Sequence, residues 1–312
     1  MASDPATSVD VAYLGPAGTF TELAVAELAS SRSSTLPVLS VQDALDMVTR
    51  GAAAQAVVPF ENSVEGSVSV TLDALIHGEP LVIVAETHVA VRFAVMVRPG
   101  TAPGDIRRVG THPHAAAQTR AWTAQHLPRA EVLPESSTAR AAEMVADGHY
   151  DAAIAAAGAA RRHSLDVVAD NVADRPGAVT RFVRLTRPGP PPPPTGADTT
   201  TLAAFLRRNH PGALLELLEQ FTARGVDLTR LESRPTGEAL GQYCFAIEAD
   251  GHLTEPRMAE ALTGLHRTCR LVRYLGSYPR AERVRQEVPP QASGSAYGDA
   301  RAWVESLTHG GA

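Results

Sequence analysis

Short apolar runs alternate with amphipathic segments along the first half of the chain. Residues 9–15, 37–40 and 54–60 have the apolar character of strands, whereas residues 20–30 and 41–51 repeat apolar positions at helical spacing. This alternation predicts a βαβαβ unit with a mostly parallel sheet. A second series of the same kind begins at residue 106 and ends with a strand at 180–187. We therefore predict an α/β fold with two similar lobes and a cleft between them.

The chain after Thr199 has a different order of elements. Two helices, at 212–225 and 255–269, are interleaved with four strand-like runs in the order βαββαβ, which is that of ferredoxin-like domains. Apolar residues at helical spacing predict that both helices pack on the sheet. These residues are Leu214, Leu217, Leu218 and Phe221 in the first helix and Ala261, Leu262 and Leu265 in the second.

The proline run at 188–196 marks the clearest boundary, because proline fixes φ and favours an extended linker. We expect a two-lobed region at 9–187, a linker at 188–197, the ferredoxin-like domain at 198–280 and a tail at 281–312. The tail is rich in charge, Pro, Gly and Ser up to about residue 300 and is expected to be poorly ordered there. A short helix is expected over residues 299–307.

Composition and charge exclude several classes of protein. The net charge of −6 provides no basic field, so neither nucleic acid nor an anionic membrane is an expected partner. The chain has no signal-peptide pattern and no apolar run of membrane-spanning length, which predicts a cytoplasmic protein. Cys244 and Cys269 are expected to be reduced, buried thiols. Phosphate-binding glycine motifs, HExxH, GxSxG and Cys/His metal clusters are absent, so we expect a polar site without a metal.

Four loops follow predicted strands, after Leu14, Phe60, Gly110 and Glu135. In open α/β sheets, ligands bind at the carboxyl ends of strands, where helix N-termini present unpaired N–H groups. The loop at 59–68 is the most polar and favours a functional reading over that of an idle surface loop. Its polar positions and glycine are Glu61, Asn62, Ser63, Glu65, Gly66 and Ser67.

The other candidate residues have a plain structural explanation as well. The glycine turn at 13–20, with Thr19, is equally compatible with an anion site and with a tight turn. His112 and His114 are more often structural than catalytic. Helix capping alone accounts for a hydroxyl among Ser136, Ser137 and Thr138. Threonine is a good strand former, so physical chemistry alone does not select Thr180.

Taken together, these segments resemble those of the prephenate dehydratase family. The matching motifs are GPxGTF at 15–20, PxENSxxGSV at 59–68, TLD at 71–73 and TRF at 180–182. GALL at 212–215 and ESRP at 232–235 resemble the phenylalanine-binding motifs of that family's ACT domain. The resemblance covers about residues 10–280. It implies a two-lobed, periplasmic-binding-protein-like catalytic region followed by a ferredoxin-like ACT regulatory domain.

The resemblance implies a lyase that converts prephenate to phenylpyruvate, water and carbon dioxide in phenylalanine biosynthesis. By this resemblance Thr180, Arg181, Phe182 and Glu61 are the catalytic candidates. Aromatisation drives that reaction, so the resemblance implies that no cofactor is needed. We expect Thr180 to donate a hydrogen bond to the departing hydroxyl. The candidates for substrate binding are Thr19, Asn62, Ser63, Glu65, Gly66, Ser67, His112, Ser137 and Thr138.

The same resemblance implies phenylalanine as an allosteric effector and a homodimer or homotetramer. The expected effector-binding residues are Gly212, Ala213, Leu214, Leu215, Glu232, Ser233, Arg234 and Pro235. The chain departs from the family pattern at Gly177 and Ala178, where an Asn is usual, and at Thr111–His114, which replaces an SHPQ-like segment.

Two other functions remain open at this point. An arogenate dehydratase would act on the amino acid that corresponds to prephenate. A non-catalytic protein with the same lobes would bind or sense an aromatic amino acid without reacting with it. The intact TRF segment favours an enzyme.

Overall fold

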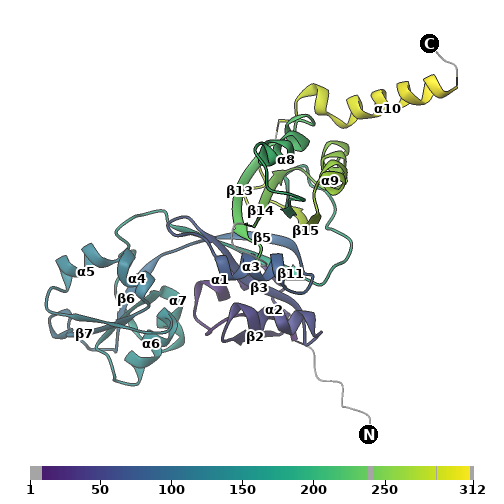
Figure 1. Ribbon diagram of the computed structural model, residues 1–312. Coiled ribbons are helices and arrows are strands. Elements are labelled where there is room, and N and C mark those ends of the chain that lie inside the picture. Colours follow the sequence, from purple (N-terminus) through teal and green to yellow (C-terminus); the bar gives the residue numbers. More distant parts are fainter. Residues whose placement is uncertain (1–8, 238–241, 286, 310–312) are drawn as a thin grey trace, which may run out of the picture. The chain divides into compact units, whose positions relative to one another are not determined.

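The computed structural model describes residues 9–237, 242–285 and 287–309, which form two compact units (Figure 1). The first unit contains residues 9–71 and 87–184. The second contains residues 72–86 together with the described residues from 185 onward. The boundary between the units near residue 185 lies just before the proline run at 188–196. The assignment of residues 72–86 to the second unit was not predicted.

The first lobe is built on a sheet with the strand order β2-β1-β3-β11-β5, to which the short β4 is added through β3. Strand β1 pairs in parallel with both β2 and β3, as predicted. The strands are β1 (Val9–Leu14), β2 (Thr35–Val38), β3 (Ala53–Asn62), β4 (Gly66–Ser67), β5 (Val82–Ala90) and β11 (Val179–Thr186). The helices are α1 (Phe20–Leu28), α2 (Val41–Thr49) and α3 (Ser69–His77).

The second lobe has the strand order β10-β6-β9-β7-β8, with β7 parallel to its neighbours and β6 antiparallel to β9 and β10. Its strands are β6 (Phe93–Val97), β7 (Arg108–Thr111), β8 (Glu131–Pro134), β9 (Ala152–Ala156) and β10 (Asp166–Ala169). Its helices are α4 (Pro113–Gln118), α5 (Arg120–His126), α6 (Thr138–Ala146) and α7 (Ala157–Arg162), with a 3₁₀ turn η1 (Pro103–Asp105).

Strand β11 differs from its expected place. The sequence pattern assigned it to the second series, but it lies in the first sheet between β3 and β5. Thr19 followed by Glu22, and Ser40 followed by Asp43, predict two capped helix starts, and the structure differs at one of them. Ser40 caps α2 by accepting a hydrogen bond from the Asp43 amide, as expected, whereas the Thr19 side chain does not cap α1. Pro113 predicts the start of one helix that ends at about residue 125, but the structure has two helices there, α4 and α5.

The second unit has the predicted βαββαβ order and a sheet ordered β13-β14-β12-β15. Its elements are β12 (Asp198–Phe205), α8 (Ala213–Thr222), β13 (Leu228–Pro235), β14 (Tyr243–Asp250), α9 (Pro256–Thr268) and β15 (Leu271–Pro279). All seven predicted helix positions belong to one core cluster, with Leu217, Phe221 and Leu265 fully buried. Cys244 and Cys269 are buried free thiols, and burial raises the pKa of both.

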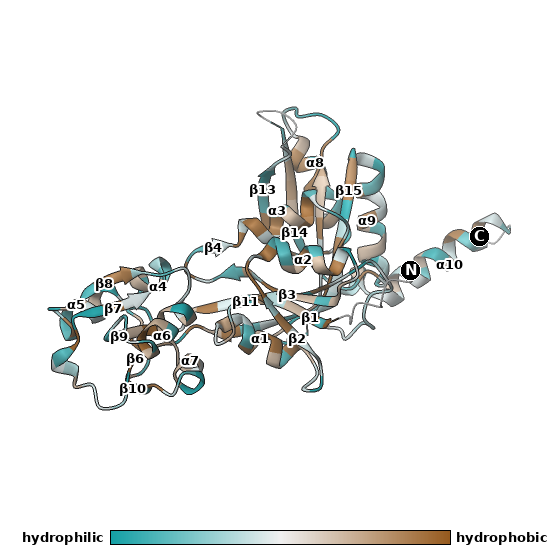
Figure 2. Ribbon diagram, turned by 90° about the horizontal axis from the view of Figure 1, so that it is seen from below, coloured by the Kyte–Doolittle hydropathy of each residue, from teal (hydrophilic) through white to brown (hydrophobic). Residues whose placement is uncertain are grey.

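The tail forms more helix than the composition suggested. After a 3₁₀ turn η2 (Pro290–Ala292), helix α10 runs over Gly294–Thr308, so it begins before the expected residue 299. The Ser293 hydroxyl accepts a hydrogen bond from the Ala296 amide, and this cap fixes the start. Hydrophobic and hydrophilic residues both appear on α10, and none of them is buried (Figure 2).

Residues 72–86 pack against the sheet of the second unit through a close backbone approach. A Cβ atom at Gly276 in β15 would lie 2.2 Å from the Ile83 carbonyl oxygen in β5. Gly276 also has φ +139°, a conformation that side chains disfavour. We predict that Gly276→Ala lowers the free energy of unfolding by about 2–4 kcal/mol, because backbone must shift to admit the methyl group. Chemical denaturation beside Gly294→Ala, whose Cβ would meet nothing within 4 Å, measures the difference.

No helix in the described ranges combines the length and the apolar character that crossing a membrane requires.

Candidate active site

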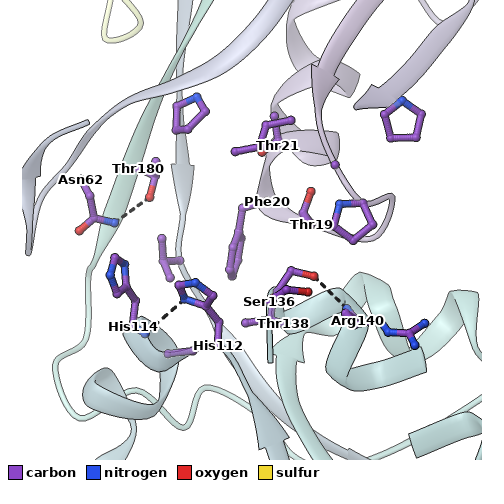
Figure 3. Close-up of a pocket in the computed structure, with 18 of the residues that line it drawn as sticks. Thr19, Phe20, Thr21, Asn62, His112, His114, Ser136, Thr138, Arg140 and Thr180 are labelled. Carbon is purple, nitrogen blue, oxygen red and sulfur yellow. Dashed lines mark hydrogen bonds between the residues drawn. The ribbon is translucent and has the colours of Figure 1, made fainter. Parts of the chain in front are cut away.

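A cavity of about 670 Å³ in the first unit receives residues from all four loops that were expected to line a site (Figure 3). Its volume suits a small organic ligand. Of the predicted site residues, the lining contains Thr19, Asn62, Glu65, His112, Ser137, Thr138, Thr180 and Phe182. Glu61, Ser63, Gly66, Ser67 and Arg181 do not line it.

Thr180 and Asn62 form the central contact of the cavity. The Asn62 side-chain amide donates to the Thr180 hydroxyl oxygen over 2.9 Å. The Asn62 carbonyl oxygen accepts from the backbone amides of Val64 at 2.8 Å and Glu65 at 3.2 Å. These two backbone donors fix which end of the amide faces Thr180.

This orientation determines what the Thr180 hydroxyl can do. A hydroxyl has one proton to donate and two lone pairs to accept with. Since Asn62 occupies a lone pair as a donor, the Thr180 proton remains available for an acceptor in the cavity. Thr180 is buried, so water competes weakly for that proton.

Ser63 holds the two strands that carry this contact. Its hydroxyl accepts from the Val179 amide at 3.0 Å, and its own amide donates to the Val179 carbonyl at 2.9 Å. Ser63 therefore positions Thr180 from one residue away, without lining the cavity itself.

Arg181 lies on the other face of β11 from Thr180. Successive side chains of a strand point to opposite faces, so Thr180 and Phe182 share the cavity face and Arg181 does not. The Arg181 guanidinium lies 3.4 Å from the Glu61 carboxylate and 5.1 Å from the centre of the Phe60 ring. Glu61 and Arg181 thus form a pair behind the strands that carry Asn62 and Thr180.

Two helix N-termini border the cavity. The Ser137 hydroxyl caps α6 by accepting from the Arg140 amide at 3.0 Å. At α1, the Glu22 carboxylate accepts from the Gly18 amide at 2.7 Å, and the Thr19 hydroxyl oxygen is buried without a hydrogen-bond partner. Thr19 therefore offers an unused donor to a polar ligand, and the free N–H groups of both first turns favour a negative charge nearby.

His114 and Gln118 of α4 connect the second lobe to Glu65 of the first, and His112 contacts His114. His114 Nδ1 lies 2.8 Å from the Glu65 carboxylate, and Gln118 donates to the same carboxylate at 3.3 Å. His112 Nδ1 accepts from the His114 amide at 3.2 Å, which leaves the proton of the neutral ring on Nε2. Burial, and secondarily His114, lower the pKa of His112 from its usual 6.5.

The lowered pKa of His112 predicts an effect on stability at acid pH. Below pH 6.5 the unfolded chain binds more protons at this residue than the folded chain does, so stability falls as the pH falls. We expect His112→Asn, which keeps a capping acceptor, to lose less thermal stability than the wild type between pH 7.5 and pH 5.5, as monitored by circular dichroism. An equal loss in both proteins would contradict this assignment.

Several lining residues were not predicted from the sequence. Among the described residues that line the cavity, Arg140 is the one Arg, and it pairs with Glu143 at 2.7 Å. Phe20 and Phe93 meet edge to face at 5.6 Å and join the two lobes. The position of Arg140, three residues after the Ser137 cap, was the available signal for its place beside a strand-end loop.

The replacement of the usual Asn by Gly177 affects the backbone conformation more than it affects side-chain contacts. Gly177 has φ +83°, and a Cβ placed there would meet nothing within 4 Å. Asn tolerates this left-handed conformation better than most residues, so the usual Asn would fit the same turn. Gly177 and Ala178 are absent from the lining of the cavity.

The predicted effector residues lie in the second unit. Gly212 adopts φ +92° directly before α8, Ala213 is buried and Leu215 is exposed. Of the eight predicted residues, Ser233 alone lines a cavity of about 310 Å³, which Phe205, Asn209, Tyr243, Phe245 and Arg270 also line. Glu232 and Arg234 pair with each other at 3.4 Å.

No group of three or more His, Cys, Asp or Glu side chains in the described part of the chain is arranged to hold a metal ion. The site instead offers hydroxyls, amides and helix N-termini around an aromatic floor. Together with the βαββαβ unit, it defines a two-lobed α/β protein with a small-molecule site and a separate ferredoxin-like domain.

Comparisons with known proteins identify the family. The prephenate dehydratase family profile matches residues 11–190. The chain is 45% identical over 309 residues to a prephenate dehydratase of Mycobacterium marinum, which covers 96% of each chain. This chain belongs to the prephenate dehydratase family, and the resemblance in its motifs is confirmed.

Solved structures agree on the fold. The prephenate dehydratase of Arthrobacter aurescens in complex with L-Phe is 47% identical, with a TM-score of 0.91 over 96% of this chain and all of that one. A protein described as a novel type of quorum quenching acylase is 33% identical, with a TM-score of 0.78 over 86% of this chain and 97% of that one. The predicted periplasmic-binding-protein-like region and ACT domain are confirmed.

Proposed function

We propose that this protein is a prephenate dehydratase whose reaction takes place in the cavity around Thr180. The single observation that carries the proposal is the Asn62–Thr180 contact, because it leaves a buried hydroxyl proton directed at a ligand. Membership of the prephenate dehydratase family supports the choice of substrate.

The reaction requires positioning more than strong acid or base chemistry. The bond between the ring and its carboxylate breaks, the electron pair moves through the ring, and the bond to the 4-hydroxyl breaks as the ring becomes aromatic. One proton converts the departing hydroxide to water. Thr180 donates a hydrogen bond to that oxygen as negative charge develops on it, and the proton comes from solvent or from the Glu65–His114 pair.

The two carboxylates of prephenate require different surroundings in the cavity. The ring carboxylate becomes neutral carbon dioxide, so apolar walls such as Phe20 and Phe93 favour its loss. The side-chain carboxylate persists and needs donors. Thr19, Arg140 and the first turns of α1 and α6 supply them.

We further propose that L-phenylalanine regulates the enzyme at the second unit, since the Arthrobacter relative is a complex with L-Phe. The cavity beside Ser233 has an aromatic wall and the cations Arg207, Arg208 and Arg270 for a carboxylate. A homodimer or homotetramer that acts in the cytoplasm remains our expectation for the assembly. The two free thiols are consistent with that compartment.

The experiment is direct. Purified protein is incubated with prephenate, and phenylpyruvate is measured by its absorbance in alkali, with and without L-phenylalanine. Turnover supports the proposal, and arogenate as the parallel substrate decides between the two dehydratases. No turnover with either substrate, while L-phenylalanine binds, would favour a non-catalytic sensing protein.

The geometry does not favour acylase chemistry of the kind ascribed to the quorum-quenching relative. A hydroxyl nucleophile needs a general base that takes its proton. Asn62 presents a donor to Thr180, not an acceptor.

A further inference from the structure

The TLD motif at residues 71–73 has no place in the catalytic cavity, and its contacts point elsewhere. Asp73 accepts two hydrogen bonds from Arg234 of the ESRP motif, from Nε at 2.9 Å and from Nη2 at 2.5 Å. This paired geometry is the strongest form of an Arg–carboxylate contact. It joins two motifs that are 161 residues apart in the chain.

The remaining contacts of Arg234 leave little of its guanidinium for a ligand. Its third nitrogen, Nη1, faces the Glu232 carboxylate at 3.4 Å. Arg234 and Glu232 share one face of β13, and Ser233 lies on the other face, beside the 310 Å³ cavity. An effector in that cavity therefore touches β13 on the face opposite to the Asp73–Arg234 pair.

Asp73 lies in helix α3, whose first turn is bound to the catalytic loop. The Thr71 hydroxyl donates to the Pro59 carbonyl at 2.7 Å, and the Thr71 amide donates to the Val68 carbonyl at 3.0 Å. Pro59 lines the catalytic cavity, and Asn62 follows three residues later. Helix α3 thus carries Thr71, which contacts the catalytic loop, and Asp73, which contacts Arg234, two residues apart in the chain.

A second contact supports the same attachment. His77, at the end of α3, makes a 3.2 Å hydrogen bond to the Pro235 carbonyl, and its ring meets Phe205 at 6.3 Å between centres. The end of the ESRP motif is therefore tied to both the middle and the end of α3.

We propose that Asp73 is a positioning residue through which an effector bound beside β13 changes the placement of the catalytic loop at 59–68. A shift of β13 moves Arg234, Arg234 moves α3 through Asp73, and α3 moves Pro59 and Asn62 through Thr71. This inference rests on the proposed regulation by L-phenylalanine and names the contact that transmits it. Coupling is reciprocal, so prephenate in turn changes the affinity for L-phenylalanine.

The test compares the wild type with two variants, Asp73→Asn and Glu79→Gln. Asp73→Asn removes the negative charge from the Asp73–Arg234 pair. Glu79→Gln removes the same charge from the same segment at an exposed position, away from Arg234. Three quantities are measured for each protein: kcat and KM for prephenate, the Kd for L-phenylalanine by calorimetry, and the factor by which L-phenylalanine changes kcat/KM. Thermal unfolding checks that each variant is folded.

We expect Asp73→Asn to bind L-phenylalanine within about threefold of the wild-type Kd, while the coupling factor falls to near one from the 5–150-fold typical of allosteric proteins. Glu79→Gln should keep the wild-type factor. Arg234→Lys cannot make the paired hydrogen bonds, so its coupling factor should fall in the same way. Combining Asp73→Asn with Arg234→Lys should lower the coupling factor no further. An unchanged factor in Asp73→Asn would overturn the proposal, as would a parallel loss of L-phenylalanine binding.

Hydrogen exchange separates this inference from the proposed activity. L-Phenylalanine should change the amide exchange of residues 59–71 in the wild type but not in Asp73→Asn, whether or not prephenate is turned over. If the wild type turns over prephenate and exchange at 59–71 ignores L-phenylalanine, the inference fails and the dehydratase function stands.

Discussion

Thr180→Ala lowers kcat for prephenate about a thousandfold, within the range that a positioned hydrogen-bond donor contributes to stabilising developing charge. The variant removes the only group that the account places on the departing hydroxyl. KM should change little, because the hydrogen bond strengthens only as charge develops on the leaving oxygen. Steady-state kinetics with prephenate, at equal amounts of folded protein, measures both constants.

Thr180→Ser is the matched control for this prediction. Serine keeps the hydroxyl and loses only a methyl group, so it should retain most of the activity. That result would assign the loss of kcat in Thr180→Ala to the missing hydroxyl and not to altered packing of the side chain. A kcat of Thr180→Ala within tenfold of the wild-type kcat would show that Thr180 does not take part in the reaction.

Asn62→Asp lowers kcat about a hundredfold at pH 7. The new carboxylate still accepts from the amides of Val64 and Glu65, so the turn after β3 is kept. It has no proton to donate to Thr180, however. The Thr180 hydroxyl therefore turns toward the carboxylate, and the departing oxygen loses its donor.

A pH series distinguishes this reversal from a general loss of structure. The carboxylate at position 62 accepts a proton as the pH falls toward its ordinary pKa of about 4 and becomes a donor again. The ratio of wild-type to variant kcat should therefore narrow between pH 7.5 and pH 5.5. A ratio that is constant over this range would show that the orientation of the hydroxyl is not the cause.

The patterning of the chain predicted the two lobes and the ferredoxin-like unit, since their helices and strands are regular. The pattern assigned β11 to the wrong sheet, because the sequence of a strand does not indicate which sheet the strand joins. The assignment of residues 72–86 to the second unit was missed for a similar reason. Their apolar positions match those of any α/β segment, and only the backbone approach of Gly276 to Ile83 shows what they pack against.

The candidate site was predictable at strand ends and less so within motifs. Asn62, Glu65 and His112 follow strands and line the cavity, as the general rule for open sheets requires. Thr180 was named through resemblance alone, since a threonine in a strand carries no signal of its own. Arg181 came with it as part of the same motif, although the alternation of a strand cannot place both side chains in one cavity.

Arg140 and Asp73 show what sequence reasoning could not reach. Arg140 occupies an ordinary helix position, and its place beside the cavity depends on how α6 meets the loop before it. Asp73 belongs to a motif that the resemblance singled out, but its partner Arg234 is distant in the chain. Three-dimensional contact alone connects the two.

The central claim is that the Thr180 hydroxyl faces the departing hydroxyl of prephenate. A crystal structure of Thr180→Ala, slow enough to retain prephenate, tests it most directly. We expect the 4-hydroxyl within about 3 Å of the space vacated by the threonine oxygen, with the side-chain carboxylate near Thr19 and the first turns of α1 and α6. A substrate whose 4-hydroxyl points away from position 180 would contradict it.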